Sequence, residues 1–256
     1  MYPLPNISIG IVTYNRLSIL KETLDRLRTH IRYPEDKIHY VISDDCTGSD
    51  YCAEIEAYCR ANKLPAKVVS TATNSGIGAN LNNVLFHVDT PFVLLMEDDW
   101  HLMQRLDLAP AAALLASETR IGAIKVRTSR ALPQHYKQHT SKIADYLPSY
   151  VEGHFAGRGE VTWFEMLATA PTLYVWSTGI NLIHRRWWMH YGTFREDLSI
   201  GATEEEYCHR VKDRARDWNN APLLATLPEW SWRSPFKHVG DVSFKPTEPT
   251  RTPQTA

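Results

Sequence analysis

The chain of 256 residues lacks the features that mark membrane and secreted proteins. No apolar run approaches the roughly 18 residues that a membrane-spanning helix requires. The amino terminus has no charged segment followed by a long apolar stretch, as a secretory signal would have. These absences predict a cytoplasmic protein, with peripheral attachment to a membrane as the alternative.

A large excess of charge is also absent, because the formal net charge is -1 and the sequence pI is about 6.8. Such a chain has no overall basic field of the kind that drives nonspecific binding to nucleic acid, although a local basic groove is compatible with it. Any polyanionic partner must therefore be bound locally. With 43% hydrophobic residues the chain can bury a sizeable core, and we expect it to form one domain.

Cysteine is scarce, and its spacing indicates no metal site. The four cysteines include no CxxC pair and no Cys/His spacing typical of zinc. Cys52 and Cys59 lie seven residues apart, which places them on one face of a helix. We therefore expect reduced, structural thiols at Cys46, Cys52, Cys59 and Cys208.

Strand and helix patterns alternate along the first 100 residues. This order is typical of an α/β fold with a mostly parallel, twisted sheet flanked by helices. Strand patterns lie at residues 7–12, 38–43, 67–71 and 92–96, and helical patterns at 17–30, 51–62 and 76–87. Later segments predict a helix at about 107–117, a strand at 121–126, an irregular surface at about 128–172, a strand at 174–183, and helices at 185–191 and 204–216.

Three consecutive acids close the most apolar of these strands. Residues 92–96 are all apolar, as in an interior strand of a parallel sheet, and Glu97, Asp98 and Asp99 follow directly. Packed carboxylates repel one another unless a divalent cation or a positively charged ligand lies between them. The carboxyl edge of such a sheet is where open α/β folds bind ligands. We interpret the cluster as a candidate cation site, with a solvated acidic turn as the alternative.

A glycine pair suggests a second possibility, a dinucleotide cofactor. Gly76 and Gly78 follow a strand and open a helix, with acids about 20 residues further on. The third glycine of that motif is replaced by Leu81, whose side chain would hold the helix away from the strand. The pair also follows the third strand rather than the first, so the pattern argues against a nicotinamide enzyme.

Four segments together resemble the nucleotide-sugar glycosyltransferases of the GT-A fold, specifically the family 2 type. They are Thr13–Arg16, Asp44–Asp45, Asn74–Gly76 and Glu97–Asp99, each following one of the first four strands. The resemblance implies a GT-A (Rossmann-like) fold in a single domain over 1–256. It divides the chain into a nucleotide-sugar-binding half at about 1–105, an acceptor-binding half at about 106–244 that includes the irregular region, and an extended tail at 245–256.

The resemblance also implies roles for these residues. Asp45, with Asp44 beside it, would contact the nucleotide base, and Thr13 with Tyr14 would line the same pocket. Asp99 would bind Mn²⁺ or Mg²⁺ as the last acid of a DxD motif whose first position is Glu97 here. Such an ion neutralises charge on a departing nucleoside diphosphate. The donor-binding candidates are Thr13, Tyr14, Asn15, Arg16, Asp44, Asp45, Asn74, Gly76, Glu97, Asp98 and Lys237.

The second half of the chain resembles the family around a candidate catalytic base. Family members carry an acidic pair there, whose second acid is the base, and an arginine six residues after it. Counting back from Arg210 gives Glu204 as the base, with Thr203 in place of the first acid and Glu205 as the alternative base. A carboxylate can accept the proton that an acceptor hydroxyl loses as it attacks. Glutamates at a helix start are also favoured by the helix dipole, which is the alternative explanation.

A histidine near the end of the chain is a further candidate metal ligand. Some metal-dependent relatives take their last ligand from such a position, which here is His238. An imidazole can complete a mostly oxygen coordination shell, and Lys237 or Arg233 could bind phosphate oxygens. Aromatic rings can also cover the apolar faces of sugars, and we expect Trp100 and Trp176 as candidate pocket walls.

The sequence therefore predicts a metal-dependent, inverting glycosyltransferase that moves a sugar from a nucleoside diphosphate, with UDP as the expected nucleotide. The acceptor would be a glycan, lipid or small molecule with a free hydroxyl, selected by residues 128–172. One alternative is a catalytically impaired protein that only binds the nucleotide sugar, since Thr203 departs from the family pattern. Another is a glycosyltransferase that acts on modified bases in DNA, against which the near-neutral charge argues.

Overall fold

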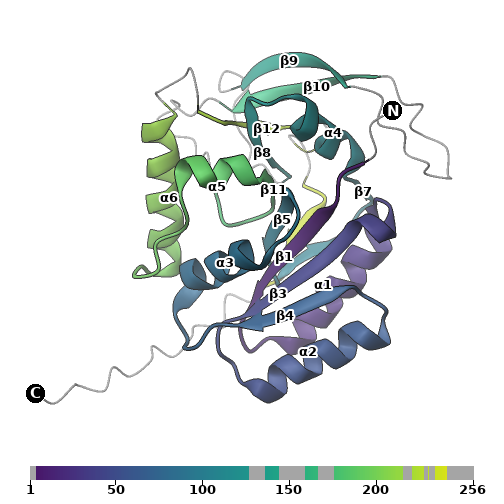
Figure 1. Ribbon diagram of the computed structural model, residues 1–256, viewed down its shortest axis with the longest axis vertical. Coiled ribbons are helices and arrows are strands. Elements are labelled where there is room, and N and C mark those ends of the chain that lie inside the picture. The colour runs from purple at the N-terminus through teal and green to yellow at the C-terminus, as the bar shows by residue number, and fades with distance from the viewer. Residues whose placement is uncertain are drawn as a thin grey trace, which may run out of the picture.

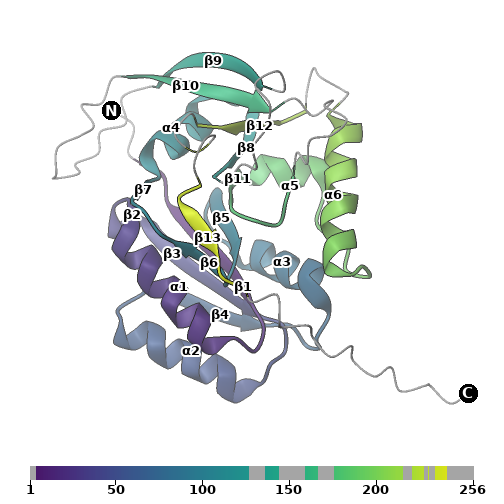
Figure 2. The same cartoon turned by 180° about the vertical axis from the view of Figure 1, so that it is seen from behind.

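The computed structural model describes residues 4–126, 136–143, 159–166, 176–215, 221–227, 230 and 234–240. A large twisted sheet carries helices on both faces, as the two opposite views show (Figure 1 and Figure 2). The predicted tail at 245–256 lies outside the described residues. Among the helices that are described, none has the length and apolar character that crossing a bilayer would take.

The main sheet has nine strands in the order β4-β3-β1-β5-β11-β8-β12-β10-β9. Its first four strands are mutually parallel, as predicted, and their carboxyl ends therefore meet at one edge. The remaining strands mix directions, since β11 runs antiparallel to both β5 and β8, while β12 is parallel to β8. The strands are β1 (Ile7–Thr13), β3 (Ile38–Asp44), β4 (Ala66–Ser70), β5 (Phe92–Glu97), β8 (Ile121–Lys125), β9 (Tyr136–Ile143), β10 (Gly159–Met166), β11 (Asn181–His184) and β12 (Leu223–Thr226).

Two hydrophobic clusters lie on the two faces of this sheet, because successive strand residues point to opposite sides. In β5, Leu94 and Met96 join the cluster under α1, α2 and α4, whereas Val93 and Leu95 join the cluster under α3, α5 and α6. A strand that is buried on both faces reads as a continuous apolar run, which is the pattern of β5. The helices are α1 (Leu17–His30), α2 (Ser49–Ala61), α3 (Gly76–His87), α4 (Ala109–Ser117), α5 (Arg185–Tyr191) and α6 (Ile200–Arg214).

Two short strand pairs and a 3₁₀ turn complete the described elements. β6 (Trp100–Leu102) pairs with β13 (Phe236–His238) in antiparallel fashion, so the last described segment of the chain returns to the residues that follow β5. This pairing brings a distant part of the sequence to the acidic strand end. The other elements are β2 (Ile31–Arg32), η1 (Glu35–Lys37) and β7 (Leu106–Asp107).

The structure corrects three of the predicted elements. The region predicted to be irregular contains an antiparallel strand pair, β9 and β10. The buried Trp163 of β10 joins the two strands, because its Nε1 donates to Ser141 Oγ of β9 at 2.8 Å. Helix α6 begins at Ile200, one turn earlier than expected, with Thr203 N donating to Ser199 O at 2.8 Å. Within the described residues, the strand predicted at 174–183 is confined to β11.

Candidate functional site

The carboxyl edge of the parallel strands gathers most of the candidate side chains. Strand register places Thr13 opposite Asp44, and Val12 opposite Glu97, so the ends of β1, β3 and β5 are level. Polar residues that follow apolar strands meet here because parallel strands end on the same side of a sheet. The acidic cluster, which we define as Glu97, Asp98 and Asp99, lies at the centre of this edge.

Asp98 is fully buried and bonded within the protein. One of its carboxylate oxygens accepts from Thr13 Oγ1 at 2.6 Å, and the other accepts from the Arg16 guanidinium. Burial raises the pKa of Asp98, and the positive charge of Arg16 opposes that rise. The Tyr51 hydroxyl, which lies 2.8 Å from Thr13 Oγ1, accepts from the Arg16 backbone N–H at 3.1 Å. Asp98 therefore fixes Arg16 beside the cluster.

Asp99 faces two side chains and keeps one oxygen unpaired. Its Oδ2 atom lies 2.7 Å from Arg16 Nη1 and 3.2 Å from His238 Nε2. Its Oδ1 atom is buried and has no hydrogen-bond partner within the described residues. The backbone of Gly240 lies against Asp99, and a side chain does not fit there, because a Cβ would lie 2.3 Å from Asp99 Oδ2. The His238 ring also packs on Trp100, with ring centroids 4.5 Å apart.

This donor set fits a divalent cation, although the described residues contain no group of three metal-ligating side chains. Asp99 offers an unpaired carboxylate oxygen, and His238 offers an imidazole nitrogen on a half-exposed side chain. Mn²⁺ accepts such a mixture of oxygen and nitrogen ligands, and Mg²⁺ favours oxygen. Two protein ligands leave coordination positions for a substrate. In the structure, the Asp99 carboxylate is paired with the Arg16 guanidinium.

Thr178 connects the acidic cluster to helix α6. Its backbone N–H donates to Glu204 Oε1 at 2.9 Å, and its hydroxyl donates to Glu97 Oε1 at 3.0 Å. Burial and the neighbouring Asp99 charge raise the pKa of Glu97 to about 7. No pattern in the sequence indicated Thr178, because it belongs to no motif and contacts residues 26 and 81 positions away.

The other glutamates of α6 point elsewhere. The Glu205 side chain is 64% exposed and lies 3.7 Å from His209 Nε2, one helical turn along. Glu206 forms an ion pair with Arg210, so the arginine that marked the spacing in the sequence does not contact Glu204. Of the three glutamates, only Glu204 contacts the described residues at the carboxyl edge.

The two acids that end β3 shape the neighbouring turns. Both oxygens of the buried Asp45 are bonded, since they accept from Ser75 N at 3.0 Å and from Gly76 N at 2.9 Å. Asp44 accepts from the Thr47 backbone at 2.7 Å and from its hydroxyl at 2.6 Å. Gly76 has a φ of +83°, which favours glycine at this turn. These contacts fix the turns that follow β3 and β4, beside the carboxyl end of β1.

The remaining candidates lie at the surface or in the core. Tyr14, Asn15 and Asn74 are exposed around the carboxyl edge, and Lys237 is exposed on β13 beside His238. Trp176 is fully buried and lies with its ring centroid 5.2 Å from that of Trp187, so the expectation that it lines an open pocket is wrong. Arg233 lies outside the described residues.

Comparisons with known proteins bear on the family and the fold of the chain. The sequence matches glycosyl transferase family 2 over residues 8–172. No curated protein sequence matches the chain. The fold is similar to that of the mannosyltransferase PcManGT from Pyrobaculum calidifontis, solved with GDP-Man and Mn²⁺, with a TM-score of 0.56 at 16% identity over 88% of this chain and 57% of that one.

Two further solved structures show the same fold. S. aureus TarS 1-349 in complex with UDP-GlcNAc gives a TM-score of 0.60 at 20% identity, over 92% of this chain and 60% of that one. GalNAc-T7 with UDP, GalNAc and Mn²⁺ gives 0.59 at 14% identity, over 88% of this chain and 43% of that one. The chain thus spans less than two thirds of the length of each of these proteins.

Proposed function

The chain belongs to glycosyl transferase family 2, and from that premise we propose that it transfers a sugar from a UDP-sugar to an acceptor hydroxyl, with inversion and with a divalent metal. One observation carries the proposal. Thr178 bonds both Glu97 and Glu204, so a carboxylate from α6 lies at the same sheet edge as the acidic cluster. A single displacement needs this combination, with one group to hold the leaving group and another to take the proton of the attacking hydroxyl.

On the donor side, Asp99 and His238 would hold Mn²⁺ or Mg²⁺. When bound, the ion neutralises negative charge that develops on the leaving nucleoside diphosphate. Arg16, whose Nη1 lies 2.7 Å from Asp99, and the exposed Lys237 would bind phosphate oxygens. The exposed Tyr14 ring is available to stack on the base. TarS and GalNAc-T7 were solved with UDP or UDP-GlcNAc and PcManGT with GDP-Man, and UDP is the nucleotide that we propose here.

On the acceptor side, Glu204 would act as the base. Thr178 holds one of its oxygens through a backbone N–H, and the other oxygen, which forms no hydrogen bond with a described residue, would accept the proton. A base that takes the proton of the acceptor hydroxyl supports direct attack by that oxygen on the anomeric carbon, and such an attack inverts the configuration of the carbon. The acceptor would be a glycan, a lipid or a small molecule. We assign the donor to residues 1–105 together with Lys237 and His238 of β13, and the acceptor to the rest of residues 106–244, in a single domain.

The departure at Thr203 does not require a loss of catalysis. Thr203 is fully buried in the first turn of α6, and its hydroxyl donates to Ser199 O at 3.0 Å. It therefore stabilises the start of the helix that carries Glu204. A threonine that serves the helix in this way gives no reason to prefer a protein that only binds the nucleotide sugar.

The test measures donor binding and turnover together. UDP should raise the melting temperature more with Mn²⁺ than without it, by mass action, and UDP-sugars should release UDP in the presence of Mn²⁺. Asp99→Ala should remove the Mn²⁺-dependent part of the stabilisation, whereas Asp50→Ala, an exposed acid at the start of α2, should retain it. Stabilisation that is identical with and without Mn²⁺, or unchanged in Asp99→Ala, would refute the metal assignment.

A further inference from the structure

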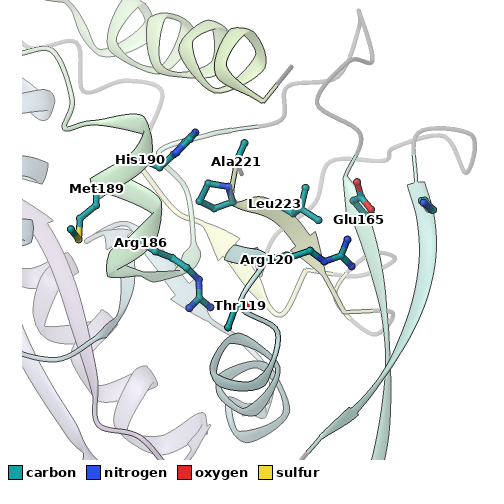
Figure 3. Close-up of a pocket in the computed structure, with 10 residues that line it drawn as sticks. Thr119, Arg120, Glu165, Arg186, Met189, His190, Ala221 and Leu223 are labelled. Carbon is teal, nitrogen blue, oxygen red and sulfur yellow. The ribbon is translucent and has the colours of Figure 1, made fainter. Parts of the chain in front are cut away.

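A cavity lies at the edge of the main sheet opposite to the acidic cluster (Figure 3). It has a volume of about 630 Å³ and we call it the basic cavity. Arg186 and His190 come from α5 on one side, and Glu165 comes from β10 on the other. Its residues used below are Arg120, Lys137, Glu165, Arg186, His190 and Pro222.

The basic cavity is separate from the carboxyl edge. Leu223 and Ile121 are the first residues of β12 and β8, and they pair with each other beside the cavity. The other end of β8, Lys125, is the end that pairs with Asn181, which in turn pairs with Leu95 near the acidic cluster. The length of β8, roughly 13 Å at 3.3 Å per residue, therefore lies between the two sites.

One wall of the cavity is rigidly built. Gly122 lets α5 and the start of β12 approach β8, because a Cβ there would lie 2.5 Å from Pro222 Cβ and 2.8 Å from a Trp187 ring carbon. The Tyr191 hydroxyl donates to Pro222 O at 2.7 Å. Arg186 donates from Nε to Ile121 O at 2.8 Å. The cavity is therefore a feature of packed elements, as ligand sites usually are.

The basic groups of the basic cavity differ in their partners. Arg186 donates to the backbone carbonyls of Leu115, Glu118 and Ile121. His190 Nε2 is buried and has no hydrogen-bond partner within the described residues. Arg120 and Lys137 are exposed, and no described residue forms an ion pair with either. Glu165, the only acid among the described residues that line the cavity, is buried, and its Oε2 atom lies 2.7 Å from His139 Nε2. A ligand here must supply acceptors and negative charge.

We propose that the basic cavity binds the phosphate group of a small phosphorylated molecule. Among the described residues that line the cavity, the three cations Arg120, Lys137 and Arg186 outnumber the single carboxylate of Glu165, and neither Arg120 nor Lys137 forms an ion pair with a described residue. A phosphate monoester carries nearly two negative charges at neutral pH and offers three acceptor oxygens. Guanidinium groups match phosphate oxygens in pairs. The volume exceeds what phosphate alone would fill and leaves room for its organic part.

The experiment is calorimetric titration of the full chain with glucose 6-phosphate and with inorganic phosphate, while UDP and Mg²⁺ are held in excess. Arg120→Glu should weaken glucose 6-phosphate binding by about tenfold or more, the equivalent of ~1.4 kcal/mol. Lys137→Glu should act in the same direction. Arg185→Glu is the matched control, because Arg185 is an exposed arginine of α5 that does not line the cavity, and its affinity should stay within about twofold of wild type.

Three results would overturn the proposal. They are the absence of binding for both probes at millimolar concentrations, an equal loss of affinity in Arg120→Glu and Arg185→Glu, and unchanged affinity in both cavity variants. Binding by the basic cavity does not depend on the proposed transferase activity. Asp99→Ala should therefore bind glucose 6-phosphate as wild type does even where it no longer responds to UDP and Mn²⁺, which separates the two proposals.

Discussion

The two edges of the main sheet carry opposite charge and satisfy it differently. At the carboxyl edge, the charge of Asp98 and Asp99 is met inside the protein by Arg16. At the other edge, Arg120 and Lys137 form no ion pair with a described residue, and the carboxylate of Glu165 lies beside His139. Because Arg16 neutralises the carboxyl edge, we expect a divalent cation to compete with Arg16 for Asp99. The other edge has no such internal partner, and we expect an external anion to neutralise its cations.

Removing the acceptor-side carboxylate should have the largest effect on the carboxyl edge. Glu204→Gln keeps an oxygen for the Thr178 N–H but cannot accept a proton at neutral pH. We expect kcat to fall by about 10²- to 10⁴-fold, the usual contribution of a general base, while UDP and Mn²⁺ still raise the melting temperature. Glu205→Gln, on the exposed side of α6, is the control and should stay near wild type in steady-state assays. Equal losses in both variants would refute Glu204 as the base.

Removing the internal cation should destabilise the carboxyl edge. Arg16→Met leaves the fully buried Asp98 without its charge partner, which should lower the free energy of unfolding by about 3 kcal/mol. Denaturant titration measures this loss. Arg26→Met on the same helix breaks an exposed pair with Glu22 and a weak contact with Met103 Sδ, and should cost less than about 1 kcal/mol. If the free energy of unfolding falls no more in Arg16→Met than in the control, Arg16 does not neutralise Asp98 as we describe.

The same variant should show a distinctive dependence on pH. Burial raises the pKa of Asp98 in the folded protein, and loss of Arg16 removes the charge that opposes this rise. The folded state then binds a proton that the unfolded chain, with an aspartate pKa near 3.8, has already lost. Stability should therefore fall as pH rises from about 4 through neutral, more steeply in Arg16→Met than in wild type. Parallel curves of unfolding free energy against pH would contradict this account.

Thr178 tests whether the carboxyl edge is positioned as a unit. Thr178→Val removes the hydroxyl bond to Glu97 and keeps the backbone N–H that holds Glu204. Because a small displacement of groups that act together at a reaction centre can lower the rate up to about a hundredfold, we expect kcat to fall by about tenfold to a hundredfold. Donor-dependent stabilisation should change little if the effect lies in positioning. Thr178→Ser should restore kcat, and a serine variant as slow as the valine variant would point to lost packing instead.

Local patterns in the sequence predicted the parallel half of the sheet but not its long-range contacts. An apolar run that ends in Glu97 can be recognised within ten residues, because burial and charge change at one point. The bonds from Thr178 to Glu97 and from Arg16 to Asp98 join residues more than 80 positions apart, which no local period encodes. The strand β9 was missed for a related reason, since most of its residues are polar and it is held by pairing with β10.

The smallest effect should come from the edge that has no counter-ion. Arg120→Ala removes one of three cations from the basic cavity and breaks no ion pair among the described residues. Because like charges at close range repel, the ligand-free protein should change in unfolding free energy by no more than about 0.5 kcal/mol, with a small gain as the expected sign. Denaturant titration at low salt measures it, and added glucose 6-phosphate should stabilise wild type more than the variant. A loss comparable to that of Arg16→Met would mean that Arg120 is held by a partner inside the protein, and the contrast between the two edges would then disappear.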